Sequence, residues 1–482
     1  MRNWLQFLIT AFAFSVATPP LAAQTRPATA SDTVRLSLSD AVRRADRLGE
    51  EVRIARANVN ATGAQVTIAR SAGLPHIGLN ATENRTVASA RGQAVGSVFN
   101  QPYTYNTSIS GSQSLFQGGR IVNGVRAANA VTAASQQDLA EARSVTDLQT
   151  QSAYLNVLFT NRVVQIQRQA YDQAAARARQ AEQFQQAGRF SRYDVLRARV
   201  ELANIEPQLL QAQENAQIAL LELRRLTNVP TAQPLALTTT IDSTAIRDVL
   251  ATVDTTVGPE KRPALQSAAQ IARARQLGIS VARAALLPSV SFNFNTGYSA
   301  FPVGGSAFPS GLGGLAVVPC AAGTDPTRVC TSQNGGFFSD RSFGFLVSWP
   351  IFDGLQNKGA IDLAGAQARL AEAQLEETRE RVYNDVARVK TDLTRARTQY
   401  DARQQSVGEA AEAFQLATLR FSRGLSTQLE VADAQIALTT AETNEARSLY
   451  DVYIAVATLA QAQGRPLPLP SNDHVADTIP PR

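Results

Sequence analysis

The chain reads FQGG at residues 116–119 and, after a long run without proline, AGRFS at residues 187–191. The same two signals return 236 residues later (352 − 116 = 236), as FDG at residues 352–354 and RGLST at residues 423–427. A constant offset means that neither copy gained or lost a residue between the two signals. The chain therefore contains a duplicated unit, and a helical repeat of this kind is typical of structural or conductive proteins.

The repeat also extends upstream, but with a different offset. Leu74-Pro75 recurs as Leu287-Pro288, 213 residues later (287 − 74 = 213). The second copy therefore holds 23 additional residues (236 − 213 = 23), which lie between Pro288 and Phe352. This variable segment is rich in glycine and serine, so we expect it to be a loop that faces outward.

The N-terminus has the features of an export signal. Arg2 supplies a positive charge, residues 4–16 form an apolar run, and residues 21–23 read LAA. Because the run is too short to cross a membrane as a helix, we predict a signal peptide at residues 1–23 and a linker at residues 24–38. An N-terminal anchor that stays attached is the alternative.

Composition and motifs argue against nucleic-acid binding and against catalysis. The chain has 46 basic and 40 acidic residues, and the basic ones are scattered and not interleaved with aromatic residues. Of its two histidines, neither His76 nor His474 has a local catalytic partner. The sequence shows no phosphate loop, nucleophile elbow or zinc-binding spacing, so we expect neither an enzyme nor a bound cofactor or metal.

Helix and strand signals divide each copy into a half-length helix, a β-hairpin, a very long helix, a sharp turn and a second half-length helix. We place the first copy at residues 39–236 and the second at 259–466, with a linker at 237–258 and a proline-rich tail at 467–482. In the first copy we expect the hairpin at about 76–116, the long helix at about 120–187 and the second half-length helix at 192–227. In the second copy the same elements are expected at about 289–352, about 355–423 and 428–463.

The lengths of the helices predict how they pack. A helix of ~65 residues at ~1.5 Å per residue is a rod of ~100 Å, which must pack lengthwise against other helices. Two half-length helices laid end to end match one such rod, and Ser39 and Asp40 are expected to cap the first of them. Pro207 is expected to kink the helix that contains it.

The second long helix carries a clear coiled-coil seam. Val382, Val386, Val389 and Leu393 follow one another in steps of four, three and four residues, which is the spacing of coiled-coil core positions. The corresponding positions of the first copy include Thr150. We therefore expect a weaker seam in the first long helix.

The predicted hairpins have one apolar face. Val290, Phe292 and Phe294 alternate with polar residues, and Phe343 and Phe345 do the same on the returning strand. Such strands fit an outer-membrane β-barrel in contact with lipid, and a half-buried strand on a soluble core is the alternative. Two hairpins provide four strands, whereas single-chain barrels start at about eight and lipid tolerates no open edge. We therefore expect several chains to share one barrel.

The two cysteines of the chain, Cys320 and Cys330, lie in the variable segment, within a long outer loop expected at residues 299–341. Exported proteins meet an oxidising environment, in which a close pair of cysteines forms a disulfide. We predict that a disulfide between Cys320 and Cys330 braces this loop.

The order and duplication of these motifs resemble those of the TolC family of outer-membrane efflux proteins, from Leu38 to about Pro468. The resemblance implies a mainly α fold with a small β part. It implies a homotrimer whose duplicated coiled-coil helices form a periplasmic α-helical barrel, topped by a shared outer-membrane β-barrel of about 12 strands, four per chain. It rests on SDA at residues 39–41, AGLP at 72–75, LFQGG at 115–119, AGRFS at 187–191, IFDG at 351–354 and RGLST at 423–427.

The same resemblance implies an exit duct in the outer membrane that carries drugs and other toxic small molecules out of the periplasm. Its partners would be outer-membrane lipid, a periplasmic adaptor (membrane-fusion) protein and an inner-membrane pump of the RND, ABC or MFS type. Two alternatives remain open: a conduit for type I protein secretion and, from the helices alone, a soluble periplasmic coiled-coil protein.

The resemblance also places functional residues at the turns far from the strands, which would be the periplasmic tips. Acids that face inward near the closed end of the family's tunnel correspond to Glu430 and Asp433, which share one helix face. Three chains would form a carboxylate ring that favours cations, and Asp194 beside Arg197 would make a mixed ring in the first copy. The adaptor would contact both turns, at Gly188, Arg189, Phe190, Ser191, Gly424, Leu425, Ser426 and Thr427.

Each of these residue types also has a purely structural explanation. Glycine caps helix ends, serine and threonine cap helix starts, and acids in a first turn complement the helix dipole. The type member of the family holds its tip shut partly with a tyrosine and an arginine, and Phe421 and Ser426 stand at those positions here. We therefore do not expect that latch to carry over.

Overall fold

The computed structural model describes the chain in several stretches: residues 33–88, 90–95, 103–240, 243–251, 253–302, 312, 314–317, 331–334 and 336–469. The predicted signal peptide and most of both predicted terminal segments lie outside the described residues. Cys320 and Cys330 also lie outside them, so the predicted disulfide stays a prediction.

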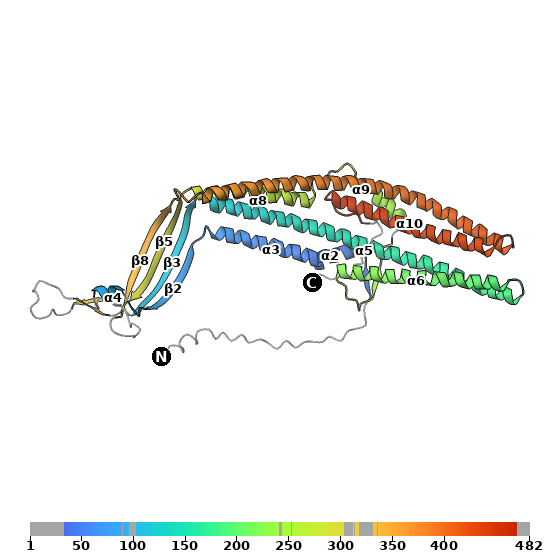
Figure 1. Ribbon diagram of the computed structural model, residues 1–482, viewed down its shortest axis with the longest axis horizontal. Coiled ribbons are helices and arrows are strands. Elements are labelled where there is room, and N and C mark those ends of the chain that lie inside the picture. The colour runs from blue at the N-terminus through green and yellow to red at the C-terminus, as the bar shows by residue number, and fades with distance from the viewer. Residues whose placement is uncertain are drawn as a thin grey trace, which may run out of the picture.

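Two long helices run along the helical part of the molecule (Figure 1). α5 (Arg120–Gln186) and α9 (Gln356–Ser422) each contain 67 residues, which is ~100 Å at ~1.5 Å per residue. α9 packs against α8 and α10, whereas α5 packs against both of these and also against α3 and α6. The helices therefore form a layer in which α5 lies in the interior and α9 lies at one edge. The shorter helices are α3 (Glu50–Ser71), α6 (Arg192–Thr227), α8 (Pro263–Arg283) and α10 (Gln428–Ala462).

The half-length helices lie end to end beside the long ones. In the first copy, Arg44 of α2 (Leu38–Leu48) donates a hydrogen bond to the Thr227 carbonyl at the end of α6, at 2.7 Å. In the second copy, α10 ends close to the start of α8, and the Gln463 side-chain amide donates to the Asp254 carbonyl at 2.9 Å. These bonds satisfy carbonyl groups that the end of a helix or a loop leaves without an intrahelical partner.

The first half-length helix differs from its prediction at two points. It begins at Leu38, because the hydroxyl of Ser37, not that of Ser39, accepts a hydrogen bond from the Asp40 amide at 3.1 Å. Ser39 lies inside the first turn. The helix also breaks at Gly49, where the backbone leaves the helical conformation and separates α2 from α3.

The two predicted linkers contain secondary structure that belongs to the packed fold. β1 (Val34–Leu36) pairs in parallel with β4 (Leu235–Leu237). The buried Tyr154 hydroxyl of α5 joins them, because it donates to a β1 carbonyl at 2.9 Å and accepts from an amide just after β4 at 3.1 Å. α7 (Ser243–Ala251) buries apolar side chains in the core of the second copy. The prediction of plain linkers is wrong at these points, since their anchoring contacts come from distant helices.

Both long helices bury a seam, but the seams are built from different residues. α9 buries larger apolar side chains, including Val386 and Leu393, against α10. α5 buries mostly small residues along much of its length, including Thr150 and Ala174. The first seam is therefore less apolar than the second, and α5 packs on both sides, where small side chains let its neighbours approach. α6 continues through Pro207 as one helix, and the kink expected there stays a prediction.

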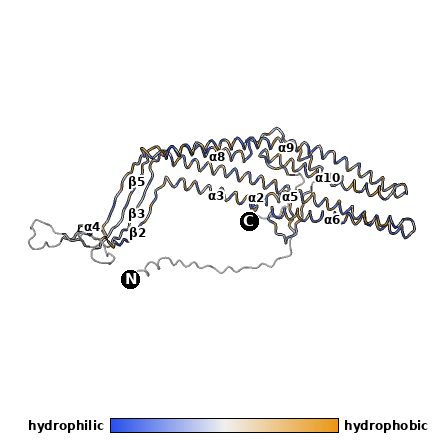
Figure 2. Tube along the Cα trace, in the orientation of Figure 1, coloured by the Kyte–Doolittle hydropathy of each residue, from blue (hydrophilic) through white to orange (hydrophobic). Residues whose placement is uncertain are grey.

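Apolar residues are spread along the helices instead of forming long runs (Figure 2). They gather in core clusters, such as the one that Ala178, Ala181, Val195 and Ala198 form between α5 and α6. In the described part of the chain, no helix is both long enough and apolar enough to cross a membrane.

A four-stranded antiparallel sheet lies at one end of the helical layer (Figure 1). Its strands lie in the order β2 (His76–Arg85), β3 (Tyr103–Gln117), β5 (Ser289–Ala300) and β8 (Phe337–Ser348). Short elements lie in the connections between strands: α4 (Ala90–Val95), β6 (Gly314–Val317) and β7 (Thr331–Asn334). At the opposite end of the layer, α5 turns into α6 and α9 turns into α10 (Figure 1).

Candidate functional site: the sheet and the helix turns

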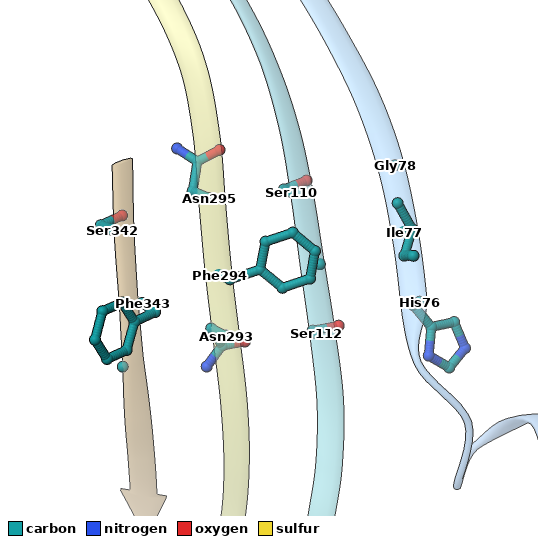
Figure 3. A pocket seen from close by; sticks show the side chains of 12 residues that line it. His76, Ile77, Gly78, Ser110, Ser112, Asn293, Phe294, Asn295, Ser342 and Phe343 are labelled. Carbon is teal, nitrogen blue, oxygen red and sulfur yellow. The ribbon is translucent and has the colours of Figure 1, made fainter. Parts of the chain in front are cut away.

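The two faces of the four-stranded sheet differ in chemistry. Paired residues form rows across the strands, and successive rows point their side chains to opposite faces. An apolar row consists of Ile77, Gly111, Phe294 and Phe343. The next row, which is polar, consists of Gly78, Ser110, Asn295 and Ser342 (Figure 3).

The apolar face exposes large side chains. The side chains of Phe343 and Leu79 are 81% and 72% exposed. A Cβ atom at Gly111 would lie 2.0 Å from the Phe294 ring, so glycine leaves the space into which this ring packs (Figure 3). Exposed apolar side chains on one face of a sheet are unfavourable in water and suit contact with hydrocarbon.

The polar face carries hydroxyl and amide groups that bond across the strands. Asn80 donates to the Ser110 hydroxyl at 3.3 Å, and Asn106 donates to the Ser299 hydroxyl at 3.2 Å. A hollow of about 680 Å³ lies on the sheet (Figure 3), and residues of both rows line it, including Ser110, Asn295 and Ser342 of the polar row and Ile77, Phe294 and Phe343 of the apolar row. The hydroxyl and amide groups of the polar face suit contact with water, so the sheet can separate an aqueous space from an apolar one.

The sheet has two open edges. Among the described strands, β2 and β8 each pair with only one neighbour. An open edge presents a row of backbone N–H and C=O groups without partners and pairs readily with a strand from another chain.

At the far end of the helices, the two turns have the same backbone. We call residues 187–191 the first tip turn and residues 423–427 the second tip turn. Gly188 and Gly424 have φ of +74° and +75°. In both turns, the residue after the glycine donates its amide hydrogen to the carbonyl four residues before the glycine, at 2.8 Å. This is the glycine-dependent helix ending that the sequence predicted as the structural explanation.

The eight residues predicted to contact an adaptor are not equally accessible. Leu425 is 68% exposed. The exposed residues also include Gly188, Arg189, Ser191, Gly424 and Thr427, whereas Phe190 and Ser426 are half-buried. Most of each tip turn is therefore open to a partner, but Phe190 is directed inward.

Phe190 joins the two tip turns. Its ring centroid lies 5.1 Å from that of Phe184 on its own helix pair and 6.3 Å from that of Phe421 on α9. Ser426 donates its hydroxyl hydrogen to the Ala417 carbonyl at 3.4 Å. The two residues that replace the family's latch therefore both make contacts: Phe421 contacts Phe190 of the first tip turn, and Ser426 bonds within its own helix pair. Sequence reasoning missed the aromatic contact because its partners lie in different copies.

The three acids predicted to line a constriction lie in different environments. The Asp194 carboxylate accepts hydrogen bonds from the Ser191 hydroxyl at 2.7 Å and the Ser191 amide at 2.9 Å, and these bonds lower the pKa of Asp194. Glu430 lies 3.5 Å from the Arg420 guanidinium, across the second tip turn. Asp433 is exposed. The first acid thus serves as a helix cap, whereas the other two remain at the surface.

Ion pairs tie the first helix pair together. Arg177 lies 2.6 Å from Glu201, and Arg199 lies 2.7 Å from Glu182, each pair joining α5 to α6. The matching positions of the second copy, 236 residues later, hold Ala413, Ala437, Gln435 and Thr418. Sequence reasoning missed this difference, although an alignment of the two copies contains the signal.

A sheet with one apolar and one polar face, continued by long helices that end in paired turns, is the arrangement of a membrane-channel wall. The comparisons with known proteins identify the family. The sequence profile of the family described as "Outer membrane efflux protein" matches residues 44–229 and 259–465, so the chain belongs to this family. The chain is also 30% identical to outer membrane protein OprJ of Pseudomonas aeruginosa over 178 residues, a match that spans 36% of this chain and 31% of OprJ.

Solved structures share the fold. The CmeC outer membrane channel of Campylobacter jejuni has a TM-score of 0.70 and 19% identity, with 89% of this chain and 85% of that chain covered. The outer membrane protein VceC of Vibrio cholerae has a TM-score of 0.69 and 19% identity, with 89% and 96% covered. These comparisons confirm the predicted family, the mainly helical fold class and the outer-membrane location. The family is one of efflux proteins, and CmeC is a channel.

Proposed function

We propose that three copies of this chain form one duct through which small molecules leave the periplasm across the outer membrane. The observation that carries the proposal is the four-stranded sheet with two faces and two open edges. Three such sheets, joined edge to edge, would make a closed barrel of about 12 strands, in which each edge finds the partner that lipid cannot supply. The apolar face would then contact outer-membrane lipid, and the polar face would line the duct.

The edges of the helical layer support the same assembly. Ile218 and Leu221 of α6 are 63% and 54% exposed, and Leu363 and Leu370 of α9 are 59% and 60% exposed. These helices lie at the two edges of the layer, so a single chain leaves apolar surface at both of them. Packing one chain's α9 edge against the α3–α6 edge of the next would bury this surface and close the helices into a tube.

We place the partners at the tip turns. The exposed Arg189 and Leu425 would meet a periplasmic adaptor protein, which would connect the duct to an inner-membrane pump of the RND, ABC or MFS type. A photo-crosslinking side chain at position 425 should capture the adaptor in intact cells. The same side chain in place of Ile436, which is 61% exposed but lies beyond the turn, is the matched control. Equal capture at both positions would contradict this placement.

We place the charge filter of the duct at Glu430 and Asp433. Hydrogen bonds from Ser191 hold the Asp194 carboxylate at the start of α6, whereas Asp433 is exposed and Glu430 has an exposed contact with Arg420 at 3.5 Å. In three copies, Glu430 and Asp433 would form rings of carboxylates that favour cations at a constriction.

The mass of the detergent-purified protein and its currents in planar lipid bilayers test the proposed duct. We expect a mass of three chains and stepwise single-channel currents. A folded protein that stays monomeric, or a trimer that inserts into bilayers but passes no current, would contradict the proposal.

A further inference from the structure

A pocket between the two helix pairs lies apart from the sheet and from the tip turns. Its volume is about 440 Å³, and most of its lining comes from α5, α9 and α10. Small-molecule sites typically enclose about 300–1,000 Å³ and combine apolar walls with a few polar groups. The pocket has both features.

Aromatic side chains form one wall of the pocket. The ring centroids of Phe159 on α5 and Tyr450 on α10 lie 6.0 Å apart, with their planes inclined by 32°. Leu155, which is 2% exposed, continues the apolar surface. Rings at this spacing can hold the flat apolar body of a ligand, and their faces attract cations.

The pocket also contains a half-buried carboxylate. Burial raises the pKa of Glu445, the guanidinium of Arg162 lowers it, and the nearby like charge of Glu442 raises it. Arg162 lies on the exposed side and donates a hydrogen bond to the Gln165 side chain at 3.5 Å. The Glu445 carboxylate therefore lies near one positive and one negative side chain, so its charge is only partly compensated.

We infer that this pocket binds an amphipathic organic cation, with its aromatic body against Phe159 and Tyr450 and its positive group beside Glu445. A cation supplies the charge that the buried carboxylate lacks, and an apolar body displaces water from the aromatic wall. The inference concerns binding in the helical wall and does not depend on the proposed duct or on its adaptor.

Ethidium, an aromatic cation, is a suitable probe, because its fluorescence anisotropy reports binding to the purified full-length protein above a detergent blank. We expect saturable binding that tetraphenylphosphonium displaces. Glu445→Gln should weaken ethidium binding about tenfold, because it removes a charged partner from a half-buried site. Glu214→Gln, which changes an exposed carboxylate on α6, should leave the affinity unchanged.

Arg162→Gln is an independent test, since its exposed side chain can be replaced without disturbing the core. It removes the positive charge that competes with the ligand, so it should tighten ethidium binding about threefold or more. Equal affinity of the wild type, Glu445→Gln and Arg162→Gln would overturn the inference. A loss in Glu214→Gln as large as that in Glu445→Gln would also overturn it, because binding would then reflect overall charge.

Discussion

The two helix pairs that end in the tip turns share a backbone but are held together by different side chains. Both turns close around a glycine with φ near +75° and make the same backbone hydrogen bonds. Two ion pairs join α5 to α6, and a capping box stabilises the start of α6. At the start of α10, by contrast, the Thr427 side chain makes no capping hydrogen bond. The pair of α9 and α10 has instead an exposed contact of Arg420 with Glu430 at 3.5 Å.

The difference shows which features the duplicated unit had to keep. A sharp turn needs a left-handed residue wherever it occurs, so the glycine is present in both copies. Side-chain ties are not needed to form the turn, and they differ between the copies. We therefore expect the second helix pair to separate near its tip turn at a lower cost in free energy than the first. Each prediction below changes a side chain that differs between the two copies, from the largest expected effect to the smallest.

Arg177→Gln should have the largest effect, because it breaks a poorly hydrated ion pair. The Arg177 and Glu201 side chains are 13% and 17% exposed. Without the guanidinium, the Glu201 carboxylate stays largely buried without a charge partner, which costs about 3 kcal/mol. Thermal unfolding followed by circular dichroism should show the loss. Arg199→Gln breaks an exposed pair, 61% and 39% exposed, and should cost less than about 1 kcal/mol. Equal effects would refute the distinction.

Phe190→Ala should loosen both tip turns, because its ring contacts Phe184 in one helix pair and Phe421 in the other. The side chain is half-buried, so we expect a local cost of about 2 kcal/mol, roughly half that of a fully buried phenylalanine. Amide hydrogen exchange near Gly188 and near Gly424 should accelerate. Leu425→Ala, at an exposed side chain, is the control and should change neither. If exchange accelerates at the first turn alone, the aromatic ring does not link the turns.

Asp147→Asn should remove a pH dependence that the second copy lacks, since the residue 236 positions later is Tyr383. Burial and the like charge of Asp46 raise the pKa of Asp147 to about 6, against the opposing effect of Arg143. Because the pKa of Asp147 is higher in the folded than in the unfolded state, the stability that protonated Asp147 contributes is complete below about pH 4 and is lost as the pH rises through about 6. The substitution should raise stability by roughly 1–2 kcal/mol above pH 7, with allowance for solvent screening, and should have little effect below pH 4.

Thermal unfolding at several pH values measures this effect. Tyr383→Phe, which removes a hydrogen bond to Glu260 at 2.9 Å, is the matched change in the second copy and should shift stability equally at pH 5 and pH 8. A gain in stability for Asp147→Asn at low pH would contradict the sign of the prediction.

The smallest expected difference lies at the starts of α6 and α10. Ser191→Ala removes the hydroxyl that accepts from the Asp194 amide and donates to its carboxylate, while the backbone amide of residue 191 can still donate to that carboxylate, and it should destabilise the first turn by about 1 kcal/mol. Thr427→Ala should cost no more than a few tenths of a kcal/mol, because its side chain makes no cap bond. Hydrogen exchange of the first turn of each helix measures both. Equal costs would show that the two helix starts are stabilised alike.

Local signals made the long helices, the tip glycines and the two-faced strands predictable from the sequence. A run without proline predicts a helix, a glycine predicts its end, and strict alternation predicts a strand, and each signal is read from neighbouring residues alone. The sequence failed where distant parts of the chain decide the structure. Tyr154 holds both predicted linkers, and the central place of α5 explains its seam of small residues. Neither feature leaves a local pattern.

The candidate site was predictable in part for the same reason. The residues of the tip turns could be named because glycine and serine mark helix ends. The sequence allowed Asp194 a place in a charged ring or a first-turn role that complements the helix dipole, and it did not predict the capping box that Asp194 forms with Ser191. The Arg420–Glu430 contact crosses a turn, and the Phe190–Phe421 contact joins the two copies, so both needed the three-dimensional arrangement.

The reversal potential of single channels in a salt gradient tests the central claim most directly, that the chain forms a duct with its charge filter on the second helix pair. We predict a cation-selective wild type, loss of that selectivity in Glu430→Gln with Asp433→Asn, and its retention in Asp194→Asn. Unchanged selectivity in the double variant, or an equal loss in Asp194→Asn, would contradict the account.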